Sequence, residues 1–61
     1  MTLPTVEIDI WPDHFGCWRV ESGGIVIDRP ASSHSLGISL MRHLRLGTET
    51  VVRWHREAKS D

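Results

Sequence analysis

The sequence predicts an α+β fold, an antiparallel β-β-β-α-β meander with one helix packed on one face of the sheet. Apolar and polar side chains alternate through Thr5–Trp11, which is typical of a half-buried strand. Leucines recur every four residues through Leu36–Leu44, which indicates one apolar stripe along a helix. Because 61 residues leave room for one core, we expect a single small domain whose ordered core covers about residues 5–57.

Turn residues separate the first three expected strands. Pro12–Gly16 combines proline, aspartate and glycine, as hairpin loops of this length do. The second strand is expected over Cys17–Glu21, and Gly23-Gly24 then supplies the positive φ angles of a tight turn. The third strand covers Ile25–Arg29 and ends at Pro30, because proline has no N–H to donate to a sheet.

A helix and a fourth strand complete the expected sequence of elements. Ser32 or Ser33 is suited to cap a helix that runs to about Leu46, and Gly47 is suited to stop it. The last strand is expected over Thr48–Glu57, and the polar residues after it are expected to fray. The side chains expected in the core are Val6, Ile8, Ile10, Trp18, Val20, Ile25, Ile27, Leu36, Leu40, Met41, Leu44, Val52 and Trp54.

Composition and charge favour a cytoplasmic protein. The chain has no basic, apolar leader at its N-terminus and no apolar run approaching the roughly 20 residues that cross a bilayer, so we expect no membrane partner. Cys17 is the single cysteine and cannot form an intramolecular disulfide. The net charge of −1 is unevenly distributed, because residues 1–28 are mainly acidic and residues 29–61 are mainly basic.

One family resemblance supports this fold. The hairpin segment Gly16–Val20, the Gly-Gly turn, the serine-initiated helix and the closing segment Val51–His55 resemble the small bacterial and phage domains called domain of unknown function 2188. The resemblance covers most of the chain, from about Val6 to Lys59. It implies the fold alone, since that family has no established activity.

No motif in the chain predicts a reaction, a metal site or a cofactor. His14 and Cys17 have the spacing of one ligand pair of a zinc site, but no second pair of ligands follows in the sequence. Cys17 lies on an expected strand rather than at a helix N-terminus, where a thiol is activated as a nucleophile. Glu7 and Asp9 share one face of a flat sheet, which offers no cleft for acid–base chemistry. We therefore expect a non-enzymatic protein.

A protein-binding face is expected on the side of the sheet away from the helix. Nothing in the expected arrangement covers that face, and a tryptophan surrounded by apolar and charged side chains is typical of an interface. Trp11 is the expected anchor, and the alternative is that it folds over Pro12 and the hairpin and leaves a solvated sheet face. The residues expected to bind protein are Trp11, Arg19, Val51, Arg53, His55, Glu7 and Asp9.

Nucleic-acid binding is the alternative. Arg42, Arg45, Arg53 and Arg56 would form a basic zone suited to phosphates. The negative net charge argues against this reading, because dedicated nucleic-acid-binding domains are usually basic.

The sequence thus favours a small adaptor or inhibitor that binds a protein. Solitary domains of this size are common among phage and mobile-element inhibitors, anti-CRISPR proteins included, and this comparison is one of class only. A nucleoprotein complex is a further expected kind of partner, because it presents a protein surface and a nucleic-acid surface together. Since so short a chain has a small core, a homodimer is a further expected form.

Overall fold

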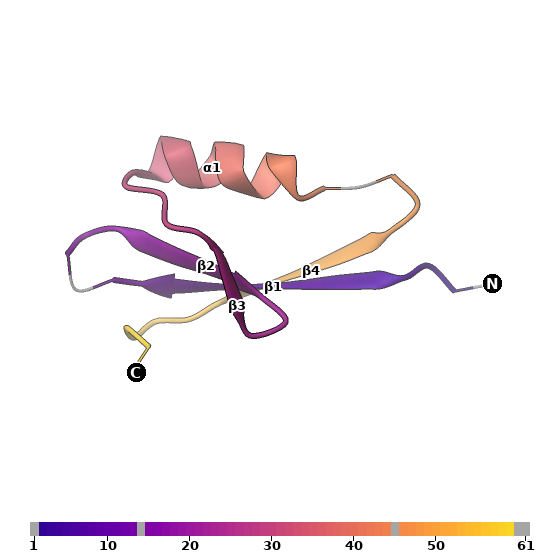
Figure 1. Ribbon diagram of the computed structural model, residues 1–61, viewed down its shortest axis with the longest axis horizontal. Helices are drawn as coiled ribbons and strands as arrows, with labels where there is room; N and C mark the ends of the chain where they lie inside the picture. Colours follow the sequence, from indigo (N-terminus) through magenta and orange to yellow (C-terminus); the bar gives the residue numbers. More distant parts are fainter. Residues whose placement is uncertain (1, 14, 45, 60–61) are drawn as a thin grey trace.

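The computed structural model describes residues 2–13, 15–44 and 46–59. His14 and Arg45, which the sequence singled out, lie outside the described residues. These described residues form one helix and four strands in the predicted order (Figure 1). Their bounds are β1 (Thr5–Pro12), β2 (Trp18–Ser22), β3 (Ile25–Asp28), α1 (Ser33–Arg42) and β4 (Glu49–Trp54). No helix among the described residues is both long and apolar enough to cross a membrane.

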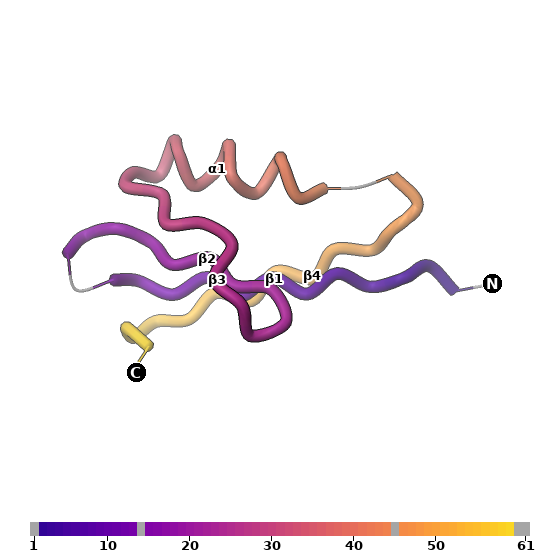
Figure 2. The backbone as a smooth tube through the Cα atoms, viewed as in Figure 1, coloured from indigo at the N-terminus to yellow at the C-terminus, as the bar shows by residue number. Residues whose placement is uncertain are grey.

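The sheet has the strand order β3-β2-β1-β4 and is mixed rather than antiparallel throughout. β1, β2 and β3 form the predicted antiparallel meander, while β4 lies parallel to β1, from the pair Thr5 and Glu49 to the pair Ile10 and Trp54. A helical crossover returns the chain to the end of the sheet from which β3 started, so β4 runs in the same direction as β3 and β1. Figure 2 shows β1 and β4 side by side, although they are far apart in sequence. The α+β class with one helix is confirmed.

The core lies between α1 and the middle of the sheet. Ile8 and Ile10 of β1, Val20 of β2 and Leu36 of α1 are its buried apolar residues. Four half-buried side chains pack around them: Val6, Trp18, Ile27 and Leu40. The alternation in β1 therefore predicted the inward face correctly.

The capping of α1 also follows the prediction at its start. The Ser32 hydroxyl accepts a hydrogen bond from the Ser35 backbone N–H at 3.1 Å, which satisfies one of the free donors of the first turn. The helix ends at Arg42, earlier than expected, and His43 is its C-cap. Gly47 has the predicted positive φ, but it lies in the connection to β4 rather than at the helix end.

The position of α1 over the sheet overturns part of the predicted core. Met41 and Leu44 are 71% and 59% exposed, and Trp54 of β4 is 58% exposed. One flank of α1, with Ile38 and Arg42, lines a pocket together with the segment that follows β3, so this flank faces β3. The helix therefore lies towards the β3 side of the sheet, and the surface beside β4 has no second layer. Val52 and Ile25, which were also expected in the core, are exposed as well.

Candidate interfaces on the sheet

The seven residues expected to bind protein share the face of the sheet opposite α1. In the strand register, Trp11 pairs with Arg19, Asp9 with Arg53, and Glu7 with Val51. Side chains of paired residues lie on the same face, and residues two apart on one strand share that face. His55 follows β4 and contacts Asp9 and Trp11 on this side. The sequence therefore placed Trp11, Arg19, Val51, Arg53, His55, Glu7 and Asp9 together correctly.

Ion pairs join β1 to β4 across this face. Arg53 Nη2 lies 2.6 Å from Glu7 Oε1, and Arg53 Nη1 lies 3.6 Å from Asp9 Oδ1. His55 Nε2 lies 2.9 Å from the same Asp9 oxygen. Arg53 and Glu7 are about half exposed, where such a pair contributes about 0–1 kcal/mol to stability, whereas Asp9 and His55 are partly buried. These ion pairs set the local arrangement of side chains more than they stabilise the fold.

Trp11 is covered by the C-terminal segment, contrary to the expectation of an open anchor. Its ring stacks on His55 with a centroid separation of 3.5 Å and an interplanar angle of 2°. The Lys59 ammonium lies 5.4 Å from the Trp11 ring centroid, within reach of a cation–π contact. The chain after β4 passes on the side of the sheet away from α1 (Figure 1). Residues 56–59 of the polar ending therefore do not simply fray, and they occupy the side of the sheet that was expected to stay uncovered.

The C-terminal segment is held to this face by its contact with a buried carboxylate. Glu21 of β2 has a side chain that is 2% exposed. Lys59 Nζ donates to Glu21 Oε1 at 2.7 Å, and Arg19 Nε lies 2.9 Å from Glu21 Oε2. A buried carboxylate is tolerated when cations or hydrogen-bond donors compensate for its lost hydration. Sequence reasoning missed the contact between Glu21 and Lys59, because no local pattern links residues so far apart.

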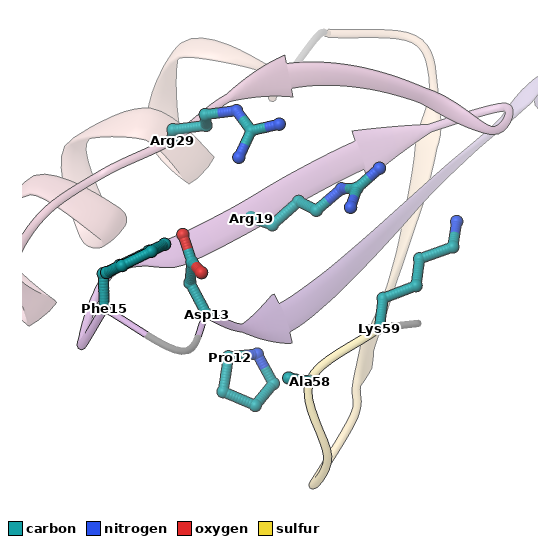
Figure 3. A pocket seen from close by; sticks show the side chains of 7 residues that line it. All are labelled: Pro12, Asp13, Phe15, Arg19, Arg29, Ala58 and Lys59. Carbon is teal, nitrogen blue, oxygen red and sulfur yellow. The ribbon is translucent and has the colours of Figure 1, made fainter. Parts of the chain in front are cut away.

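A shallow pocket of about 260 Å³ opens next to this contact (Figure 3). Two of its cations, Arg19 and Lys59, belong to the Glu21 cluster, and Arg29 extends from the segment after β3. The other lining residues are Pro12, Asp13, Phe15 and Ala58. This lining offers no nucleophile beside a base. Within the described ranges, no group of three or more histidine, cysteine, aspartate or glutamate side chains is arranged to hold a metal ion.

The fold alters the acidity of Asp28, at the end of β3. Hydrogen bonding with the Ser39 side chain, then with the Arg29 backbone N–H, lowers the pKa of Asp28 below its ordinary value of 3.8. The positive charges of Arg42 and His43 act in the same direction. This cluster links β3 to α1, so it supports the position of the helix over that side of the sheet.

The lowered pKa of Asp28 predicts an acid-dependent loss of stability. The ionised carboxylate is favoured in the folded state, so its contribution is present above pH 3.8 and is lost as the pH falls through the lowered pKa. Asp28→Asn should remove this part of the pH dependence, measured as the free energy of unfolding in urea from neutral to acid pH. Asp13→Asn is the control. Equal acid slopes in wild type and Asp28→Asn would contradict the prediction.

The arginines of the nucleic-acid alternative are not brought onto one surface. Arg42 lies on α1, on the flank that faces β3. Arg53 lies on the opposite side of the sheet, where it pairs with Glu7 and Asp9. Arg56 follows β4 and is exposed. Those of the four arginines that the structure describes therefore do not form one basic zone.

A second surface, which sequence reasoning missed, lies between α1 and β4. We call it the β4 apolar surface, and its residues are Leu40, Met41, Leu44, Val52 and Trp54. The flank of α1 that faces away from β3 carries Met41 and Leu44, and the helix-side face of β4 carries Val52 and Trp54. The Trp54 ring meets Trp18 edge to face at a centroid distance of 6.1 Å and is otherwise open. The available signal was the pair Val51-Val52, which makes both faces of β4 apolar.

The comparisons with known proteins found no match to a family, a curated protein or a solved structure. The resemblance to domain of unknown function 2188 therefore stays a prediction.

Proposed function

We propose that this chain is a non-enzymatic protein-interaction domain, of the size of a small adaptor or inhibitor, and that its binding surface is the β4 apolar surface. The observation that carries the proposal is the distribution of apolar side chains. Among the described residues, four apolar side chains form the core, whereas Met41 and Leu44 on one flank of α1 and Val52 and Trp54 on the helix-side face of β4 are exposed. Contiguous exposed apolar surface is costly in water and marks sites that another protein covers.

The chemistry of the surface also favours a protein over a nucleic acid. A half-exposed tryptophan surrounded by aliphatic and methionine side chains is the composition of an interface centre. None of the five residues that define the β4 apolar surface carries a charge. Phosphate groups therefore have no cation to contact there, whereas an apolar protein surface gains by excluding water from it.

The test is retention of protein by the immobilised chain. Tagged wild type is incubated, after nuclease treatment, with host lysate in one arm and with untagged chain in another, and is washed at low and moderate salt. Met41→Asp and Trp54→Asp each place a charge on the β4 apolar surface. Phe15→Asp is the matched control, because Phe15 is exposed and apolar but lies in the hairpin loop after β1.

We expect one protein to be retained in at least one arm by wild type and by Phe15→Asp, and to be lost by both surface variants. Apolar burial depends little on salt, so the retained protein should persist at moderate salt. Circular dichroism of each variant establishes that it is folded. Loss of all bound material after nuclease, or equal retention by all four proteins, would overturn the proposal.

A further inference from the structure

β4 is an edge strand, and its outer row of backbone groups faces away from the sheet. Its neighbour is β1, and no strand follows it in the order β3-β2-β1-β4. The Glu49 N–H donates to Pro4 O at 2.8 Å, and the His55 N–H donates to Ile10 O at 2.9 Å. In a parallel ladder, N–H groups of alternate residues point to the neighbouring strand. The N–H and C=O groups of Thr50 and Val52 therefore point outward.

The two edges of this sheet differ in how they are protected. β3 has four residues, an irregular register against β2 at Val20 and Glu21, and Pro30 shortly after its end. Short length, bulges and proline are common devices against pairing with another chain. β4 has six residues, a regular register with β1, and neither proline nor lysine. The unprotected edge is therefore also the edge that adjoins the β4 apolar surface.

We propose that the partner of the β4 apolar surface is a second copy of this chain, joined by antiparallel pairing of β4 with the partner's β4. This inference rests on the proposed function, because it names the protein that covers the surface. A two-fold axis perpendicular to the sheet joins the two sheets into one. It also places both helices on the same side, so the exposed flank of α1 with Met41 and Leu44 faces the partner's equivalent flank.

The charges of β4 select the register of this pairing. With Val51 opposite the partner's Val51, Glu49 lies opposite the partner's Arg53, and the reverse pair follows by symmetry. Glu49 is exposed, and its side chain has no ion pair with another described residue. Opposite charges on facing residues of adjacent strands contribute about 0.2–1 kcal/mol. A register centred on Val52 instead places Arg53 opposite the partner's Val51 and forms no such ion pair.

The backbone agrees with the same register. Thr50 lies opposite the partner's Val52, and both residues direct their N–H and C=O groups outward, so each pair exchanges two hydrogen bonds. Val51 then forms a non-hydrogen-bonded pair with the partner's Val51, in which facing side chains approach most closely. A cysteine at this position can therefore reach its symmetry mate to form a disulfide.

The experiment combines mass measurement with cross-linking. Sedimentation equilibrium of wild type across micromolar concentrations should show a monomer–dimer equilibrium. Glu49→Arg should raise the dissociation constant about tenfold, because like charges then face each other in both symmetric pairs. Glu57→Arg, with the same charge change at an exposed residue of the segment after β4, should leave the constant unchanged. In a Cys17→Ser background, Val51→Cys should form a covalent dimer on mild oxidation, and Ile25→Cys on the β3 edge should not.

Several results would contradict the proposed β4–β4 dimer. A chain that stays monomeric at all concentrations would overturn it, and so would a dimer whose formation Glu49→Arg leaves unchanged. Equal cross-linking of Val51→Cys and Ile25→Cys would overturn the register. If wild type is monomeric but retains a host protein through the β4 apolar surface, the proposed function stands and the second copy is excluded as partner. If neither occurs, both proposals fail.

Discussion

Ile10→Ala is expected to leave most of the chain unfolded at room temperature. Ile10 is fully buried in β1, pairs with Val20 on one side and Trp54 on the other, and lies under the helix. Removing so large a side chain from a packed core costs about 2–5 kcal/mol. A single core in a chain of this size supplies about 3–5 kcal/mol of net stability, so the loss is comparable to the whole. Circular dichroism and urea unfolding measure the effect.

Ile25→Ala is the matched control for this prediction. It makes the same chemical change on β3, where Ile25 is 69% exposed. Its expected effect on the free energy of unfolding is within about 0.5 kcal/mol, because an exposed side chain leaves no cavity when it is shortened. If Ile10→Ala lost less than about 1 kcal/mol, the core would not be centred on β1 as the structure has it. The comparison should be made at one protein concentration, since association would add to the measured stability.

The elements best predicted from the sequence are those whose signal is local. Alternation along β1 identified Ile8 and Ile10 as inward-facing, since neighbouring side chains on a strand point to opposite faces. Gly23 and Gly24 have the positive φ angles that the turn between β2 and β3 requires. Ser32 caps α1 as expected. Each of these features depends on a few consecutive residues, so the sequence alone was sufficient.

The features of β4 could not be predicted in the same way. Its apolar residues at Val51 and Val52 showed a strand, but the pattern does not reveal whether a helix covers either face. That depends on where α1 lies over the sheet, where its Leu36 and Ser39 are buried and one of its flanks lines a pocket with the segment after β3. The parallel direction of β4 likewise follows from the crossover and not from the residues of the strand. Trp54 was therefore assigned to the core although it lies on an exposed surface.

The sequence predicted which residues share the face opposite α1, but it did not predict how exposed those residues are. Strand alternation correctly grouped Trp11 with Arg53 and His55. His55 and Lys59 cover Trp11, and Lys59 also reaches Glu21 across 38 residues of sequence. A polar chain end without periodicity gives no sign of such a contact. The sequence thus identified which side chains share this face, and only the three-dimensional structure reveals how much of it remains free.

Lys59→Met is expected to destabilise the fold by about 1–3 kcal/mol, the range for a hydrogen bond lost from a charged, buried group. Methionine keeps the apolar length of the side chain and removes the ammonium that compensates Glu21. Arg19 remains beside the other carboxylate oxygen, which keeps the loss below that of a fully unpaired buried charge. The C-terminal segment should also detach from Trp11, so Trp11 should become more accessible to a fluorescence quencher. Urea unfolding and quenching by acrylamide measure the two effects.

A double-mutant cycle separates the interaction energy between Lys59 and Glu21 from the general effect of changing the C-terminal segment. Glu21→Gln removes the buried charge, so adding Lys59→Met to it should cost less than Lys59→Met alone, and the difference is the coupling between the two side chains. Glu57→Met changes an exposed residue of the same segment and should leave stability within about 0.5 kcal/mol. Equal losses from Lys59→Met in both backgrounds would show that the ion pair does not hold the segment. In that case the stacking of His55 on Trp11, rather than the contact of Lys59 with Glu21, would hold the C-terminal segment against the face opposite α1.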